Sequence, residues 1–224
     1  MNVNPKEPKA ESRDRFVLSK GHSSPALYST LTKKGYFKEE ELNSFRKIDS
    51  NLQGHPDMNK VPGVDMTSGS LGQGLSVANG MALASKMDSM GYRVYCLLGD
   101  GEIEEGQVWE ACMTSSKYKL DNLCVIVDNN NLQIDGEIQT VKGLNKIEEK
   151  FESFGFNVIT VNGNNIEQLI DAFDRAKMAK GAPTAIIAKT IKGKGVSFME
   201  NIASWHGKAP NEEQFNLAIK ELEK

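Results

Sequence analysis

Short apolar runs alternate with longer amphipathic stretches along most of the 224-residue chain. Four runs have the length and composition of buried strands, and helix-length segments separate them. The expected strands cover residues 93–98, 123–128, 156–161 and 184–189, and the expected helices between them cover residues 104–118, 145–154 and 165–180. This β-α-β-α-β-α-β order predicts an α/β fold, in which a mostly parallel sheet is flanked by helices on both faces.

Four further helices are expected outside this core, from Pro25 onward and over residues 39–48, 72–87 and 211–223. The helix over 72–87 consists of small and apolar residues, so we expect it to be buried close against a neighbour. Residues 49–70 are rich in Gly, Pro, Asp, Asn and Ser without a low-complexity run, which predicts a long functional loop. No repeat or domain boundary interrupts the pattern, so residues 1–224 are expected to form a single domain.

Composition narrows the range of partners. The net charge is −3 and no basic cluster occurs, which disfavours a nucleic-acid or anionic-membrane partner. No apolar stretch approaches the roughly 20 residues that span a bilayer, and the N-terminus lacks the apolar core of a secretory signal. Cys96, Cys112 and Cys124 lie in apolar surroundings without metal-ligand spacing, which predicts buried free thiols. We therefore expect a cytoplasmic protein.

Oxygen-bearing side chains follow two of the expected strands. Gly99-Asp100-Gly101 comes after one apolar run, and Asn129-Asn130 comes after the next. The carboxyl ends of parallel strands lie side by side, at the edge of the sheet where ligands bind. A carboxylate and an amide oxygen suit a hard divalent cation that also holds phosphate oxygens. The pattern therefore predicts Asp100 and Asn130 as metal ligands, with the backbone carbonyl of Leu132 as a third, and a diphosphate cofactor.

Glycine-rich segments near this edge leave alternatives open. Taken alone, Gly99-Asp100-Gly101 is typical of a simple strand-to-helix turn, and only the Asn pair favours a ligand site. Gly69–Gly74 is either a close-packed helix start or backbone that approaches a ring or a phosphate, because no strand precedes it as a dinucleotide fingerprint requires. Lys192–Gly195 is too short for a phosphate loop of the Walker type and reads as a flexible basic turn, yet it follows a strand. Residues 102–106 open a helix, whose unpaired N–H groups suit phosphate.

The chain has three histidines, and each lies in a short loop bounded by Gly or Pro. They are His22, His55 and His206. None is paired at the helical spacing of a zinc site, so a zinc site is not expected. A lone loop histidine is more often a surface or structural residue, but the shared setting of all three also fits a polar pocket.

In this combination the sequence resembles the diphosphate-binding, N-terminal part of transketolase, in the form that is split into two subunits. The matching stretches extend in order along nearly the whole chain: Arg13–His22, Gly54-His55-Pro56, Thr67–Gly74, Gly99-Asp100-Gly101, Asn129-Asn130, Ile134-Asp135-Gly136, Lys192–Gly195 and Trp205–Pro210. The related deoxyxylulose-phosphate synthases differ around the histidine of the first stretch and fit less well.

The resemblance implies a thiamine diphosphate enzyme that moves a two-carbon ketol unit between sugar phosphates. It implies that Asp100, Asn130 and the Leu132 carbonyl hold Mg²⁺ or Ca²⁺. The other implied sites are cofactor contacts at His22, Gly69, Leu71, Gly101, Glu105, Asn130 and His206, and catalytic roles for His22, His55 and His206. The resemblance further implies that Gly69 and Leu71 face the aminopyrimidine, that His55 contacts the hydroxyls of the donor sugar, and that Glu105 helps to couple two active sites across a dimer.

Two departures from the family pattern bear on activity. The carboxylate that activates the aminopyrimidine comes from a second, pyrimidine-binding domain, so we expect a C-terminal transketolase subunit as partner, in a dimer of heterodimers. The usual Ser-Gly-His-Pro-Gly segment, with a further histidine, does not occur before Arg13. Two other functions remain open at this point: a truncated, non-catalytic binding module, and a related thiamine diphosphate enzyme that acts on another ketose phosphate.

Overall fold

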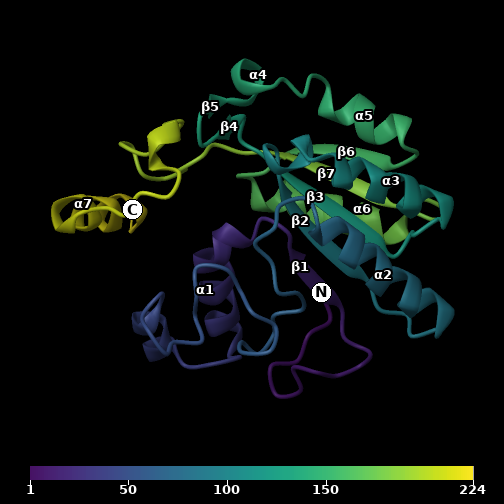
Figure 1. The fold of residues 1–224 in the computed structure, drawn as a ribbon, viewed down its shortest axis with the longest axis horizontal. Coiled ribbons are helices and arrows are strands. Elements are labelled where there is room, and N and C mark those ends of the chain that lie inside the picture. The colour runs from purple at the N-terminus through teal and green to yellow at the C-terminus, as the bar shows by residue number, and fades with distance from the viewer. Residues whose placement is uncertain (224) are drawn as a thin grey trace.

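A single parallel sheet forms the centre of the computed structural model, which describes residues 1–223 (Figure 1). Its strands lie in the order β1-β2-β3-β7-β6, and every neighbouring pair runs parallel. The strands are β1 (Arg15–Leu18), β2 (Val94–Gly99), β3 (Leu123–Asn129), β6 (Asn157–Asn162) and β7 (Thr184–Lys189). The predicted parallel sheet is confirmed, and each of the four predicted strands agrees with the structure to within one residue at either end.

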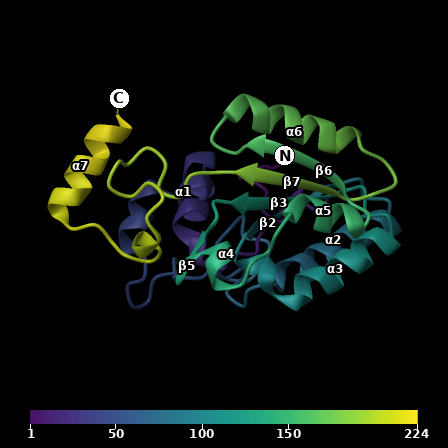
Figure 2. The same ribbon diagram turned by 90° about the horizontal axis from the view of Figure 1, so that it is seen from above.

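Helices cover both faces of the sheet, as the alternating pattern predicts (Figure 2). One face is covered by α2 (Gly74–Met87), α3 (Gly106–Lys117) and α5 (Ile147–Ser153), and the other by α6 (Ile166–Met178). Successive strand side chains point to opposite faces. In β3, Val125 therefore packs in the core under α2 and α3, whereas Ile126 packs in the core under α6.

A smaller helical layer packs beside β1. It contains α1 (Ser24–Lys34) and the loop over residues 49–70, and its core includes Tyr28, Leu52 and Val61. The Tyr28 hydroxyl donates to the Gln53 carbonyl at 2.8 Å, which fastens the loop to α1. This loop carries His55, so its attachment determines where that histidine lies.

A buried ion pair fastens the other end of the same loop. Asp65 accepts two hydrogen bonds from the Arg13 guanidinium, and its Oδ2 also accepts from the Phe16 backbone N–H at 2.8 Å. The carboxylate therefore ties the loop to the first strand of the sheet.

After β7 the chain leaves the sheet as an arm over residues 190–211, passes through the 3₁₀ helix η4 (Ala203–Trp205) and ends in α7 (Glu212–Leu222). Figure 1 shows α7 apart from the sheet, beyond the carboxyl ends of the strands. Ser197 in the arm donates from both its backbone N–H and its hydroxyl to the Glu221 carboxylate, at 2.6 and 2.7 Å. These bonds hold α7 to the arm that carries His206.

Three sequence predictions need correction. The helix expected over residues 39–48 is a 3₁₀ helix, η2 (Glu39–Ser44), and none of its residues is fully buried, although Leu42 packs against the core beside α1. The helix expected over 104–118 is interrupted, because Glu105 has extended backbone angles between η3 (Glu102–Glu104) and α3. The helix α2 buries only one face, since Val77 is 38% exposed on the other.

A small β-hairpin does not follow from the sequence pattern. It consists of β4 (Leu132–Gln133) and β5 (Gly136–Glu137), and the short helix α4 (Ile138–Val141) follows. Strands of two residues carry too little alternation to register as a pattern. The hairpin matters because it begins at Leu132, beside the predicted metal ligands.

The cysteine prediction is confirmed, because all three thiols are free and buried. Burial raises the pKa values of Cys112 and Cys124 to about 12, so both thiols stay protonated at neutral pH. Within residues 1–223 no helix has the length and apolar character needed to cross a membrane.

Candidate functional site

Asp100 lies at the carboxyl end of β2, and its carboxylate contacts the Asn-rich turn that follows β3. The side chain is buried; its Oδ2 accepts from Asn129 Nδ2 at 3.2 Å and from the Asn131 backbone N–H at 2.5 Å. Its Oδ1 accepts from the Gly101 backbone N–H at 2.9 Å. Asn131 adopts a positive φ of 63°, which an asparagine tolerates and which turns its N–H back toward Asp100. The two strand ends singled out in the sequence therefore meet.

The donor set at this point fits a hard cation. Burial raises the pKa of Asp100 against three hydrogen bonds that lower it, and all three donors are neutral. No group of three His, Cys, Asp or Glu side chains suited to a metal occurs within residues 1–223, so a cation here must take amide and carbonyl oxygens as well. Asn130 supplies an amide oxygen, which already accepts from the Leu132 backbone N–H at 3.1 Å and has a second lone pair for a cation. These oxygens are the ligands that Mg²⁺ and Ca²⁺ prefer.

A second carboxylate at the same edge has a different surrounding. Asp128 in β3 pairs with Lys20, which follows β1, and also accepts from the Thr190 hydroxyl, which follows β7. Burial by itself raises the pKa of Asp128, but the Lys20 charge and hydrogen bonds from Lys20, Thr190 and Asn130 lower it below its usual value. Asp128 is therefore ionised, and its bonds to Lys20 and Thr190 join the ends of β1, β3 and β7. Asp100 differs from Asp128 because it has no positively charged hydrogen-bond donor.

Two of the three histidines contact each other at this edge of the sheet. His22 lies in the 3₁₀ helix η1 (Gly21–Ser23) after β1, and His206 lies in the arm after β7. Their rings are stacked, with centroids 5.3 Å apart and planes inclined by 27°. Desolvation and the nearby charges of His206, Lys20, Lys192 and His55 lower the pKa of His22 to about 4. Both rings are thus held as neutral imidazoles at pH 7, since the pKa of His206 is lowered in the same way by desolvation and Lys192.

Lys192 adds a cation to the histidine pair. Its Nζ lies 3.2 Å from His206 Nδ1, and desolvation and the Lys20 charge lower its pKa, while the Asp128 and Asp100 charges oppose that shift. A lysine that lies beside a second lysine and a histidine favours the binding of an anionic ligand. The segment that the sequence indicates as a flexible basic turn therefore places a lysine at the site.

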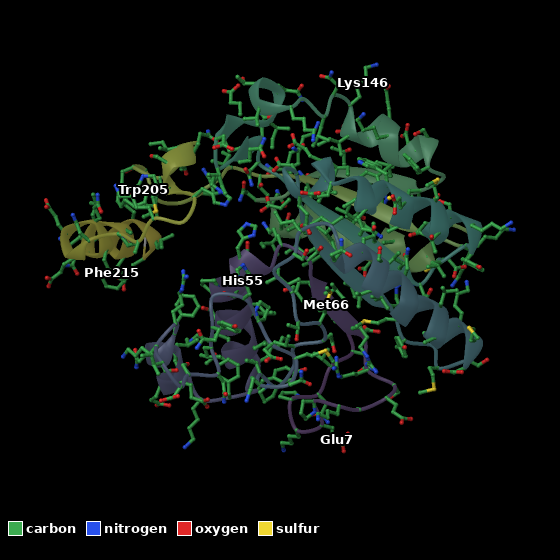
Figure 3. The ribbon with its side chains drawn as sticks, in the orientation of Figure 1. Glu7, His55, Met66, Lys146, Trp205 and Phe215 are labelled. Carbon is green, nitrogen blue, oxygen red and sulfur yellow. The ribbon has the colours of Figure 1, made fainter. Side chains whose placement is uncertain are left out.

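His55 and the Gly69–Gly74 segment form the next wall of the site. An added Cβ at Gly69 would come 3.2 Å from the His55 ring, and Gly69 has a φ of 146°, so this position requires glycine. Leu71 is 37% exposed, and an added Cβ at Gly72 would come 2.7 Å from Glu105 Cβ. In Figure 3 the His55 side chain lies at the end of the sheet that faces the arm with Trp205.

The turn that carries His22 packs against the same segment, because an added Cβ at Gly21 would come 2.9 Å from the Gly69 backbone nitrogen. All predicted site residues therefore lie along one edge of the sheet. The set comprises His22, His55, Gly69, Leu71, Asp100, Gly101, Glu105, Asn130, Leu132 and His206. The exposure of His22, His55 and Leu71 shows that this edge is an open face.

Sequence reasoning missed the contribution of Lys20, Asp128 and Glu102 to this edge. Each lies within three residues of a strand end, so the rule that located Asp100 also points to them. The ion pair between Lys20 and Asp128 could not be predicted from the sequence. Lys20 follows β1 and Asp128 lies in β3, and the order of the strands in the sheet brings the two residues together.

Comparison with known proteins identifies the family. The family model "Transketolase, thiamine diphosphate binding domain" matches residues 1–222. The chain is 45% identical to the 6-deoxy-6-sulfo-D-fructose transketolase subunit SqwG of a Clostridium species over 224 residues, which cover 100% of this chain and 82% of that protein. It is also 45% identical to an apulose-4-phosphate transketolase subunit of Phocaeicola vulgatus, over 99% of this chain and 79% of that protein.

Solved structures agree. The transketolase of Campylobacter jejuni superimposes with a TM-score of 0.95 at 37% identity, over 100% of this chain and 36% of that one. The chain thus spans about a third of the length of this undivided relative, and about four fifths of the two subunits named above. The chain belongs to the transketolase family, in which it corresponds to the thiamine diphosphate-binding domain.

Proposed function

We propose that this chain is the diphosphate-binding subunit of a transketolase built from two kinds of subunit, and that residues 1–224 form its single domain. With its partner it transfers a two-carbon ketol unit from a ketose phosphate to an aldose phosphate. One observation supports this most: the buried Asp100 carboxylate meets the Asn129–Asn131 turn at the edge where His22, His206 and Lys192 gather. Oxygen ligands for a cation thus occur beside one lysine and two neutral imidazoles that can contact a diphosphate.

The metal and the diphosphate share one end of the site. Asp100, the Asn130 amide oxygen and the Leu132 carbonyl would hold Mg²⁺ or Ca²⁺ at the diphosphate end of the site. Gly101 offers its backbone beside the diphosphate, where an added Cβ would come 3.1 Å from the Gln133 side chain, so that any larger residue would crowd this turn. His22 and Lys192 line the remaining side, where a lysine acts as a point charge toward phosphate.

The other end of the site receives the rings of thiamine. Gly69 and Leu71 face the aminopyrimidine, and Glu105, which packs against Gly72, couples the two active sites of the assembly. Bound thiamine diphosphate supplies the electron sink that is needed to break and form a carbon–carbon bond. The residues of this edge would bind and orient the cofactor.

The histidines act on the substrate. His22, His55 and His206 exchange protons with sugar hydroxyls, and His55 contacts the donor. A general base must be unprotonated at the working pH. The lowered pKa values of His22 and His206 meet this requirement at neutral pH.

The partner is a C-terminal, pyrimidine-binding subunit that contributes the carboxylate which activates the aminopyrimidine. Each active site then needs both subunits, and we propose a dimer of heterodimers in the cytoplasm as the assembly. The two relatives described as transketolase subunits support this division of the enzyme.

We propose two classes of donor sugar. One relative is named for 6-deoxy-6-sulfo-D-fructose and the other for apulose 4-phosphate, and this chain is 45% identical to each. A related ketose phosphate is therefore the second candidate donor beside a pentulose phosphate. We disfavour a non-catalytic binding module, because all the expected site residues of this chain are present at one edge.

Reconstitution tests the proposal. The chain is mixed with its C-terminal partner subunit, thiamine diphosphate and Mg²⁺, and ketol transfer from xylulose 5-phosphate to ribose 5-phosphate is followed. A panel of other ketose phosphates is run in parallel to identify the donor. Turnover with any donor of the panel supports the proposal, and absence of turnover with a verified partner across the whole panel contradicts it.

A further inference from the structure

Glu102 is a buried carboxylate that joins three separate segments of the chain. It lies two residues after Asp100, in η3, and is 3% exposed. Its Oε1 accepts from the Ser19 hydroxyl and from the Gly72 backbone N–H at 3.0 Å, and its Oε2 accepts from the Gly99 backbone N–H at 3.0 Å. None of these donors is adjacent to Glu102 in the chain, so their bonds fix the relative positions of separate segments.

Each donor stands directly beside part of the candidate site. Ser19 precedes Lys20 and the turn that carries His22, and Gly99 precedes Asp100. Gly72 follows Leu71, inside the Gly69–Gly74 segment. Movement of any donor therefore moves a neighbouring site residue.

The three segments are packed too closely to slide past one another. An added Cβ at Gly74 would collide with the Ser19 side chain, and one at Gly72 would come 2.7 Å from Glu105 Cβ. Gly72 also has a φ of 82°, a conformation that favours glycine. Close packing alone does not prevent the segments from moving apart. The hydrogen bonds that all three segments donate to Glu102 oppose that movement.

We propose that Glu102 is a positioning residue, which holds the end of β1, the end of β2 and the Gly69–Gly74 segment in the arrangement that receives the cofactor. The link to the cofactor rests on the proposed function, whereas the link among the three segments rests on the hydrogen bonds alone. Glu102 acts through these segments and itself touches neither cofactor nor substrate.

The position calls for a carboxylate. Both oxygens of Glu102 accept, and two of the three donors are backbone N–H groups that cannot reverse their role. A glutamine has a single acceptor oxygen, so in one orientation its NH₂ group faces the Gly99 N–H and in the other it faces the Gly72 N–H. Either orientation leaves one buried backbone donor unpaired.

The test uses the variant Glu102→Gln and two readouts. NMR-detected hydrogen exchange at the Gly72 and Gly99 amides is expected to become at least about tenfold faster at one of them, because a charge-assisted bond is lost there. Calorimetric titration of thiamine diphosphate with Mg²⁺ is expected to show about tenfold weaker binding. Glu104→Gln is the matched control, since it makes the same change in η3 while its carboxylate accepts from Gln133. It is expected to leave both readouts at the wild-type value.

Several outcomes decide the proposal. Unchanged exchange at both amides overturns it, and so does an equal acceleration at every core amide, which indicates a general loss of stability. If Glu102→Gln does not fold, Ser19→Ala takes its place: faster exchange at Gly72 supports the proposal and unchanged exchange overturns it. If the wild-type chain assembled with its partner subunit binds no thiamine diphosphate, the proposed function fails, while the exchange data still decide the role of Glu102.

Discussion

Replacement of Asp100 by asparagine separates metal binding from folding. The carboxylate accepts three hydrogen bonds from neutral donors, at 2.9, 3.2 and 2.5 Å, and is 2% exposed. The asparagine of the Asp100→Asn variant keeps the volume of the side chain but has one acceptor oxygen and no charge. We expect the free energy of unfolding without ligand to change by no more than about 1 kcal/mol, because the loss of one charge-assisted hydrogen bond is offset by removal of the cost of burying a charge.

The effect on ligand binding is expected to be much larger. At a free thiamine diphosphate–Mg²⁺ concentration about 100 times Kd, the wild-type chain gains about 2.7 kcal/mol of stability, and a variant that does not bind gains none. About 1 kcal/mol shifts Tm by roughly 2–4 °C in a chain of this size, so the two proteins differ in ligand-induced shift by about 5–11 °C.

Thermal unfolding, with and without cofactor and Mg²⁺, measures this difference. Asp135→Asn makes the same chemical change at an exposed position on the nearby hairpin and is expected to keep the full shift. An Asp100→Asn variant that shows the wild-type ligand shift would refute the assignment of Asp100 to the metal. A variant that is unfolded without ligand would refute the claim that Asp100 serves binding rather than folding.

Three further predictions test other parts of the site and the fold. Lys192→Ala is expected to weaken thiamine diphosphate binding in calorimetry about tenfold, because a cation near the diphosphate is lost, whereas Lys194→Ala, at an exposed position, is not. The NMR signals of the His22 ring are expected to titrate near pH 4, not near pH 6.5. Since unfolding restores the usual pKa, the neutral His22 ring makes stability fall as the pH drops from about 6.5 toward 4, and a midpoint near 6.5 would contradict this. Asp65→Ala leaves the Arg13 guanidinium buried without its ion-pair partner and is expected to lower the free energy of unfolding, measured in urea, by about 3–5 kcal/mol. A decrease of less than about 1 kcal/mol would contradict this.

The strand pattern predicted the sheet well, because β2, β3 and β7 are buried on both faces and read as continuous apolar runs. The 3₁₀ helix over Glu39–Ser44 and the break at Glu105 could not be predicted in the same way. Both depend on whether tertiary contacts cover the segment, and local periodicity does not report those contacts.

The sequence predicted those site residues that lie directly at the carboxyl ends of strands. Asp100 and Asn130 needed only the rule that parallel strands end together. The stacking of His22 on His206 could not be predicted from residues alone, because it depends on the path of the arm after β7. The family resemblance indicated roles for both histidines, and the structure supplies the geometry that joins them.

Thiamine diphosphate, bound through a divalent cation at the carboxyl edge of the sheet, is the centre of the proposed function. Titration calorimetry of the wild-type chain, assembled with its C-terminal partner subunit, with thiamine diphosphate in Mg²⁺ and again in a chelator tests this binding most directly. We expect saturable binding in Mg²⁺ that is lost in the chelator and in the Asp100→Asn variant. Binding of equal affinity under all three conditions, or no binding in Mg²⁺, would contradict the proposal.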